Sequence, residues 1–125
     1  MNNAEKKLIL LIEDDDIVSD ILVKRLEKAG YLVETANDGK RGLTMIQEKK
    51  PDLVLLDIML PVLDGFGVLE ELRDSGILPD LPVIIISNSG QPVEIERALK
   101  LGVKDHLVKL NFNPGEVLEK VKRIL

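Results

Sequence analysis

Apolar and polar segments alternate along the chain in a pattern that predicts strands and helices in turn. Short aliphatic runs predict strands buried on both faces at residues 8–12, 53–56 and 83–86. Residues 31–36, where polar and apolar positions alternate, predict a strand nearer the edge of a sheet. Residues 103–108 predict a fifth strand.

Apolar residues at helical spacing predict a helix after each of these strands. The helices are expected to begin near residues 16, 42, 65, 92 and 114 and to end near residues 28, 49, 76, 101 and 125. In the first helix, four apolar residues are expected to share the inward face: Ile17, Ile21, Leu22 and Leu26. Asp15 or Asp16 is expected to cap this helix, and of the two we assign Asp16 as the cap and the partner of the helix dipole.

This alternation predicts an α/β domain with a single doubly wound parallel sheet, because right-handed crossovers place helices on both faces. In such a sheet, ligands bind outside the carboxyl ends of the strands. Polar residues with useful chemistry fall at these ends: Glu13, Asp14, Asp57, Ser87 and Lys109. We therefore expect acids from two strands, a hydroxyl group and a lysine to meet at one edge of the sheet.

Composition indicates one globular domain, and we expect it to cover residues 1–125, with any output domain absent from this chain or removed. Hydrophobic residues make up 45% and charged residues 31% of the chain, which excludes disorder by composition. A net charge of -5 and an aromatic content of 2% argue against a nucleic-acid surface. The chain has no cysteine, no start typical of a signal peptide and no apolar run of membrane-spanning length. We expect a cytoplasmic protein without membrane or direct nucleic-acid partners.

The acids at the predicted edge indicate a metal-assisted reaction. Two like charges about 4 Å apart cost on the order of 4 kcal/mol at a surface-like dielectric constant. Mg²⁺ offsets this repulsion and suits one or two carboxylates together with water and a phosphate oxygen. Asp57, at the tip of a buried strand, can then attack a phosphoryl group as a carboxylate nucleophile. Lys109 and the Ser87 hydroxyl would face the charge that develops on the phosphoryl oxygens.

These residues and their order resemble the receiver domain of the bacterial response-regulator family across nearly the whole chain. The matching motifs are Glu13-Asp14, Asp57 within Leu-Leu-Asp-Ile-Met-Leu-Pro, Asp64-Gly65, Ser87 and Lys109. The resemblance implies a flavodoxin-like fold with five helices and five strands in the order 2-1-3-4-5. It also implies phosphorelay signal transduction, in which a histidine kinase or phosphotransfer protein places a phosphoryl group on Asp57.

The resemblance further implies a role for each site residue. The Mg²⁺ ligands would be Asp14, Asp57, the Met59 backbone carbonyl and, through water, Glu13. Ser87 and Lys109 would contact the phosphoryl group on Asp57. The implied activity is limited to self-phosphorylation and self-dephosphorylation at Asp57, so the chain is not expected to be an enzyme in its own right.

The resemblance also implies a switch that reports phosphorylation to a downstream protein. The switching face would be built from the fourth helix, the fifth strand and the fifth helix. Basic residues of an otherwise acidic chain lie in this region: Lys100, Lys104, Lys120, Lys122 and Arg123. They favour an acidic partner surface. Ser87 and His106 are the implied switch pair, with His106 swinging inward when Ser87 is drawn to the phosphoryl group.

Two positions depart from the usual family pattern. Leu110 follows Lys109 where the family usually has proline. A cis bond before leucine would cost about 2.5–4 kcal/mol, so we expect a trans loop, and the reach of Lys109 becomes a question for the structure. His106 occupies the switch position where tyrosine or phenylalanine is usual.

Three other functions fit parts of the sequence. A degenerate receiver, binding a protein independently of phosphorylation, is kept open by Leu110 and His106. A flavin-binding module of the same architecture would need a Gly-, Ser- or Thr-rich phosphate loop where this chain has the acids of residues 13–16. A metal-dependent hydrolase would need a general base beyond these acids. Phe66 is expected to be a packing residue rather than a recognition residue.

Overall fold

The computed structural model describes residues 6–78, 80–87, 91–109 and 113–125. The described strands are β1 (Leu8–Ile12), β2 (Leu32–Ala36), β3 (Leu53–Asp57), β4 (Val83–Ser87) and β5 (Asp105–Val108). The described helices are α1 (Asp16–Lys28), α2 (Gly39–Lys49), α3 (Gly65–Asp74), α4 (Pro92–Leu101) and α5 (Pro114–Ile124). Strands and helices alternate as the sequence predicts. The trans loop predicted at Leu110 lies outside the described residues.

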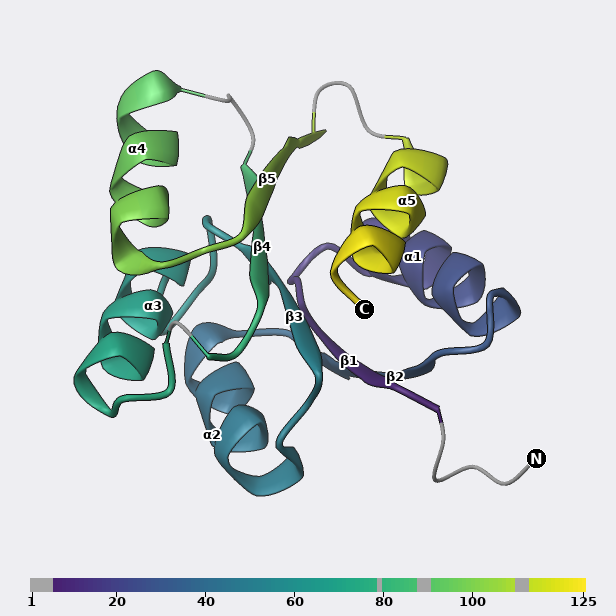
Figure 1. The fold of residues 1–125 in the computed structure, drawn as a ribbon, viewed down its shortest axis with the longest axis horizontal. Helices are drawn as coiled ribbons and strands as arrows, with labels where there is room; N and C mark the ends of the chain where they lie inside the picture. The colour runs from purple at the N-terminus through teal and green to yellow at the C-terminus, as the bar shows by residue number, and fades with distance from the viewer. Residues whose placement is uncertain (1–5, 79, 88–90, 110–112) are drawn as a thin grey trace.

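The described strands form one parallel sheet in the order β2-β1-β3-β4-β5 (Figure 1). β3 is central: Ile12 of β1 pairs with its Leu56, and Ile86 of β4 pairs with its Asp57. Every residue of β3 and β4 is buried, as their continuous aliphatic sequences predict. β2 lies at an edge and keeps exposed positions, which its alternating pattern also predicts.

Helices cover both faces of the sheet. Figure 1 shows α1 and α5 on one side and α2, α3 and α4 on the other. The first layer buries Leu22 of α1 and Val121 of α5 in one core, and the second buries Met45, Leu72 and Ala98 in another. In the part of the chain that the structure describes, no helix is long and apolar enough to cross a membrane.

The N-cap of α1 is Asp15, so the assignment of Asp16 as the cap is wrong. Asp15 has extended backbone angles, and its Oδ1 accepts hydrogen bonds from the backbone N–H groups of Ile17 at 2.9 Å and Val18 at 3.2 Å. Asp16 is the first helical residue, where its negative charge still interacts favourably with the positive end of the helix dipole.

The inward face of α1 also differs from the prediction. Leu22 and Leu26 are fully buried, but Ile17 is 73% and Ile21 42% exposed. Two neighbouring stripes of α1 are apolar at four-residue spacing, and the sheet covers only the stripe that contains Leu22, Leu26 and the partly buried Val18. The apolar surface of Ile17 and Ile21 therefore faces solvent.

Two elements start at different residues than predicted. α2 begins at Gly39 rather than Gly42, because Asp38 Oδ1 accepts a hydrogen bond from the Arg41 N–H at 2.7 Å and caps the helix earlier. β5 begins at Asp105 rather than residue 103. Neither shift changes the order of the strands or the residues at their carboxyl ends.

The loop between β3 and α3 is held tightly against the start of α2. A side chain at Gly39 would overlap the backbone carbonyl oxygen of Leu63, so only glycine permits this approach. Within the loop, the Leu63 N–H donates to the Pro61 carbonyl oxygen at 2.8 Å around Val62, which has a φ of 70°. This γ-turn geometry is strained for a β-branched residue, and Val62 is 77% exposed, so burial does not compensate.

We expect Val62→Asn to raise the free energy of unfolding by about 1 kcal/mol, because asparagine tolerates positive φ better than valine. Urea denaturation measures the difference. Val93→Asn is the matched control, since Val93 is 76% exposed and lies in α4 rather than in the strained turn. If the Val62→Asn protein were no more stable than wild type, the backbone at Val62 would not be strained.

Candidate functional site

The carboxyl ends of four strands deliver the candidate residues to one edge of the sheet (Figure 1). Glu13 and Asp14 follow β1, Asp57 ends β3, Ser87 ends β4 and Lys109 follows β5. Because the strands are parallel and β3 lies between β1 and β4, these segments leave the sheet on the same side. The edge therefore collects three acids, a hydroxyl group and an ammonium group.

Lys109 joins the acids of two strands. Its Nζ donates a hydrogen bond to Asp57 Oδ2 at 2.9 Å and to Glu13 Oε2 at 3.0 Å. The side chains of Glu13 and Asp57 are buried, at 0% and 1% exposure, whereas that of Lys109 is 17% exposed. The substitution of leucine for proline after Lys109 therefore does not prevent the ammonium group from reaching Asp57.

The remaining carboxylate oxygens have different environments. Asp57 Oδ1 accepts a hydrogen bond from the Met59 N–H at 3.1 Å, which fixes the carboxylate against the following loop. Glu13 Oε1 lies 2.8 Å from Lys109 Nζ, but this contact is an ion pair without hydrogen-bond geometry, and Oε1 has no hydrogen-bond partner among the described residues. The ammonium charge already lies beside Oε1, and the hydrogen-bonding capacity of this oxygen is open to a donor or a cation.

Glu13, Asp14 and Asp57 fit a hard divalent cation. Each offers one carboxylate oxygen, and these oxygens lie within 4.8 Å of one another. A set made only of oxygen ligands suits Mg²⁺, which keeps several waters. Asp14 is exposed, which leaves solvent access for those waters. The carbonyl group of Met59, in the loop that follows Asp57, stays a predicted ligand.

Burial and charge shift the pKa values of two of these groups. Burial raises the pKa of the Glu13 carboxyl group, and Asp57 raises it further against the opposing effect of Lys109. Burial alone would lower the pKa of Lys109, but its hydrogen bonds to Glu13 and Asp57 outweigh burial and raise that pKa. Lys109 is therefore charged at neutral pH, and ionised Glu13 is held at a cost in free energy.

We expect Glu13→Gln to stabilise the protein by about 1 kcal/mol at neutral pH when no divalent cation is present. Because the folded-state pKa of Glu13 lies above its ordinary value of 4.5, wild-type stability falls as pH rises from 4.5 through the raised pKa. The gain should therefore be largest at neutral pH and vanish below pH 4.5. Urea denaturation across this pH range measures it.

Glu48→Gln, at an exposed position of α2, serves as the control for loss of one negative charge. If the gain from Glu13→Gln were the same at every pH, the raised pKa would not be its cause.

Ser87 and His106 lie on neighbouring strands. Ser87 is buried and pairs in register with Val108, while His106 pairs with Ile85. The imidazole is 40% exposed, and its Nδ1 lies 3.8 Å from Asp105 Oδ1. The role of these two residues as a switch pair stays a prediction.

An ion pair that the sequence analysis missed joins β5 to α5. Lys120 Nζ lies 2.8 Å from Asp105 Oδ2, and the His106 N–H donates to Asp105 Oδ1 at 2.7 Å. Burial would raise the pKa of Asp105, but Lys120 and this N–H outweigh it and lower that pKa. Lys120 thus has a carboxylate partner and is only 16% exposed, so it adds less to the basic face than its sequence position indicates. Nothing in the sequence pairs these residues, because they lie on different elements.

A protein-family model described as the response regulator receiver domain matches residues 9–122. The chain belongs to the response regulator receiver family. This confirms the resemblance inferred from the acids, Asp57, Ser87 and Lys109.

Curated relatives of this receiver domain are transcriptional regulators. It is 40% identical over 120 residues to the probable transcriptional regulator ycf27 of Cyanophora paradoxa, covering 96% of this chain and 48% of that protein. It is 37% identical over 119 residues to the alkaline phosphatase synthesis transcriptional regulatory protein PhoP of Bacillus subtilis, covering 95% of this chain and 48% of that protein. The chain spans about half the length of these relatives.

Solved receiver structures share the fold. The receiver domain of the Francisella response regulator 1452 superposes with a TM-score of 0.88 at 30% identity, covering 95% of this chain and 96% of that one. Chemotaxis response regulator CheY4 of Vibrio cholerae gives a TM-score of 0.87 at 28% identity, covering 96% and 99%. Together with the strand order, these structures confirm the predicted flavodoxin-like receiver fold.

Proposed function

We propose that this receiver domain acts in a phosphorelay by accepting a phosphoryl group on Asp57 from a histidine kinase or phosphotransfer protein, with Mg²⁺ as cofactor. The observation that carries the proposal is the position of Lys109 Nζ, 2.9 Å from Asp57 Oδ2 and beside the acidic cluster. Such a site supplies a nucleophilic carboxylate, a fixed cation and oxygen ligands for a metal within one small volume.

Phosphoryl transfer at this site is a single displacement at phosphorus. A carboxylate oxygen of Asp57 forms a bond to phosphorus while the bond between phosphorus and the donor imidazole nitrogen breaks, and the imidazole leaves with the bonding electron pair. The product is an acyl phosphate on Asp57. Reaction with water returns the carboxylate and releases inorganic phosphate.

Each neighbouring residue has a defined task in this step. Mg²⁺, held by Asp14, Asp57 and the Met59 carbonyl with Glu13 acting through water, would neutralise charge on the carboxylates and on the phosphoryl oxygens. Lys109 is already in contact with Asp57 and needs little movement to contact a phosphoryl oxygen instead. The Ser87 hydroxyl would donate to another phosphoryl oxygen.

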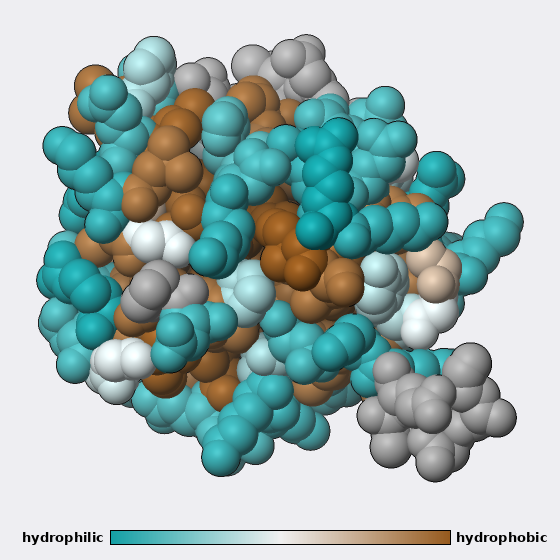
Figure 2. All heavy atoms as spheres, viewed as in Figure 1, coloured by the Kyte–Doolittle hydropathy of each residue, from teal (hydrophilic) through white to brown (hydrophobic). Residues whose placement is uncertain are grey.

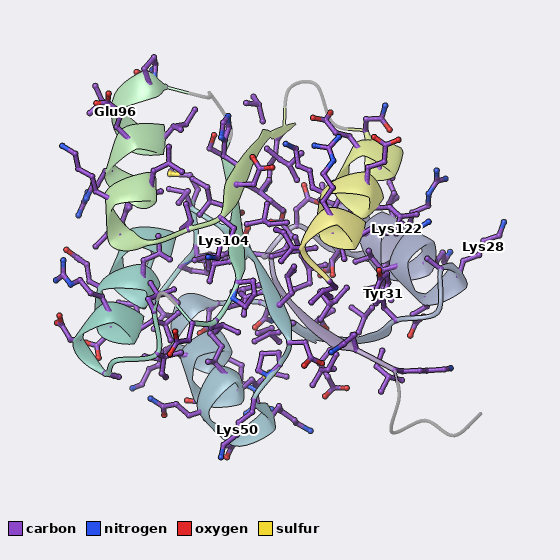
Figure 3. The ribbon with its side chains drawn as sticks, viewed as in Figure 1. Lys28, Tyr31, Lys50, Glu96, Lys104 and Lys122 are labelled. Carbon is purple, nitrogen blue, oxygen red and sulfur yellow. The ribbon has the colours of Figure 1, made fainter. Side chains whose placement is uncertain are left out.

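The switch extends from this edge to the face formed by α4, β5 and α5, which lie together in Figure 1. Figure 2, in the same view, shows exposed apolar surface among hydrophilic surface. Figure 3 shows Lys104 beside β5 and Lys122 on α5. We assign this face to a downstream protein with an acidic surface. Charge reversal at Lys104 and Lys122 is expected to weaken that binding, and an unchanged affinity would exclude the assignment.

His106 is expected to change rotamer when Ser87 moves toward the phosphoryl group. Its half-exposed ring on edge strand β5 is not fixed by burial. Crystal structures with and without beryllofluoride, a phosphoryl mimic, measure the change. One unchanged His106 rotamer in both structures would remove this residue from the switch.

Incubation with a small-molecule phosphodonor and Mg²⁺, followed by intact mass measurement, tests the proposed function. We expect the gain of one phosphoryl group and no gain when a chelator removes the metal. A mass that never changes would favour the degenerate receiver. The acceptor Asp57, the neighbouring acids and Lys109, which meet in one site, argue against that alternative. A colourless protein would exclude the flavin-binding module.

A further inference from the structure

Arg97 of α4 reaches across to α3, where it makes two contacts. Its guanidinium carbon lies 4.2 Å from the centre of the Phe66 ring, and its Nη2 lies 3.5 Å from Glu70 Oε2. A cation over an aromatic face and an ion pair each stabilise the packing of the two helices. We refer to Phe66, Glu70 and Arg97 together as the Arg97 clamp.

The α3 end of the clamp adjoins the backbone of the phosphorylation site. Gly65, which precedes Phe66, donates its N–H to the Ile58 carbonyl oxygen at 2.8 Å. A Cβ atom at Gly65 would lie 2.7 Å from the Asp57 carbonyl oxygen, so the first turn of α3 rests on the backbone that carries Asp57. Phe66 itself is 7% exposed and packs in the core, as the sequence analysis expects.

The α4 end of the clamp lies on a helix whose N-terminal half is partly or fully exposed. The buried residues of α4 are Ala98 and Leu101, both in its C-terminal half. Its N-cap, Gln91, makes no side-chain capping hydrogen bond, and Val93 and Leu99 are exposed. Arg97 therefore adds a polar attachment at the point where the buried half of α4 begins.

We propose that the Arg97 clamp holds α4 against α3 in the unphosphorylated protein and thereby restrains phosphorylation of Asp57. This inference rests on the proposed function. As part of this proposal, α4 shifts away from α3 when the switching face responds to phosphorylation. This shift breaks both contacts of Arg97, so the clamp stabilises only the unphosphorylated arrangement. An interaction made only in that arrangement lowers the population of the arrangement that accepts the phosphoryl group, so its removal raises that population and with it the rate of phosphorylation. Arg97 is a positioning residue in this scheme, since it does not contact the reacting atoms.

Hydrogen exchange in the unphosphorylated protein tests the structural half of the proposal. We expect the amides of α4 to exchange roughly three- to tenfold faster in Arg97→Ala than in wild type, with β3 amides unchanged. Arg73→Ala is the matched control, because Arg73 is an exposed arginine of α3 whose ion pair is with its neighbour Asp74. Unchanged exchange in α4, or equal acceleration in Arg73→Ala, would overturn the clamp.

The rate of phosphorylation by a small phosphodonor with Mg²⁺ tests the functional half. Arg97→Ala is expected to be phosphorylated roughly three- to tenfold faster than wild type, Glu70→Gln less so, and Arg97→Lys close to wild type because it keeps a cation over the ring. A rate in Arg97→Ala equal to or below that of wild type would overturn the restraint. If wild type itself gained no phosphoryl group, the proposed function would fail, and the restraint with it, whereas exchange in α4 would still decide whether the clamp holds the helix.

Discussion

Replacing Asp57 with asparagine is expected to abolish phosphoryl incorporation while making the folded protein more stable. The amide cannot act as the carboxylate nucleophile, so no acyl phosphate forms. At the same time the substitution removes one of the two buried acids that share Lys109, and the ammonium group keeps Glu13 as its partner. Relief of repulsion between like charges should raise the free energy of unfolding by roughly 1–2 kcal/mol without divalent cation.

These opposite effects make the experiment decisive, because a loss of phosphorylation cannot then be attributed to unfolding. Intact mass after incubation with phosphodonor measures the first effect, and urea denaturation the second. Asp74→Asn, at the exposed C-terminal end of α3, is the matched control and should leave both properties unchanged. Phosphoryl incorporation at the wild-type level in Asp57→Asn would contradict the role assigned to this residue.

Replacing Lys109 with alanine is expected to destabilise the protein by about 3 kcal/mol in the absence of divalent cation, because two buried carboxylates lose their shared cation. The raised pKa of Lys109 means that its stabilising contribution is fully present below pH 10.5 and is lost as pH rises through the folded-state pKa. The difference between variant and wild type should therefore be undiminished at neutral pH. Phosphorylation should also slow, roughly 100-fold, because one fixed cation at the phosphoryl oxygens is gone.

Urea denaturation with and without Mg²⁺ separates the electrostatic cause from a general packing defect. Mg²⁺ should recover much of the stability that Lys109→Ala loses, since a divalent cation also compensates the acids. Lys49→Ala is the control: Lys49 pairs with Glu34 at 3.4 Å on the surface, and its loss should cost less than 1 kcal/mol. A Lys109→Ala protein as stable as Lys49→Ala would contradict the account of the buried charges.

The sequence predicts the sheet and the site edge well because both follow from local pattern. The aliphatic runs that end at Ile12, Asp57 and Ser87 are too short and too continuous to be surface helices, and parallel pairing brings their ends together. The same pattern could not separate the two apolar stripes of α1, because the choice between Ile17 and Leu22 depends on where the sheet lies.

Contacts between distant elements were beyond the sequence for a related reason. The reach of Lys109 to Asp57 depends on the path of the chain after β5, and the pair formed by Asp105 and Lys120 depends on the position of α5. The Arg97 clamp likewise requires α3 and α4 to pack together before its contacts exist. Periodicity assigns a residue to a face of its own element, but not to its partner on another.

Locating the phosphoryl group on the chain tests the central claim most directly. Borohydride converts an acyl phosphate to an alcohol, so reduction of the phosphorylated protein followed by peptide mass analysis marks the modified residue as homoserine. We predict a single mark, at position 57. Homoserine at another aspartate, the longer amino alcohol at a glutamate, or a stable phosphate ester on Ser87 in place of any mark would contradict the account.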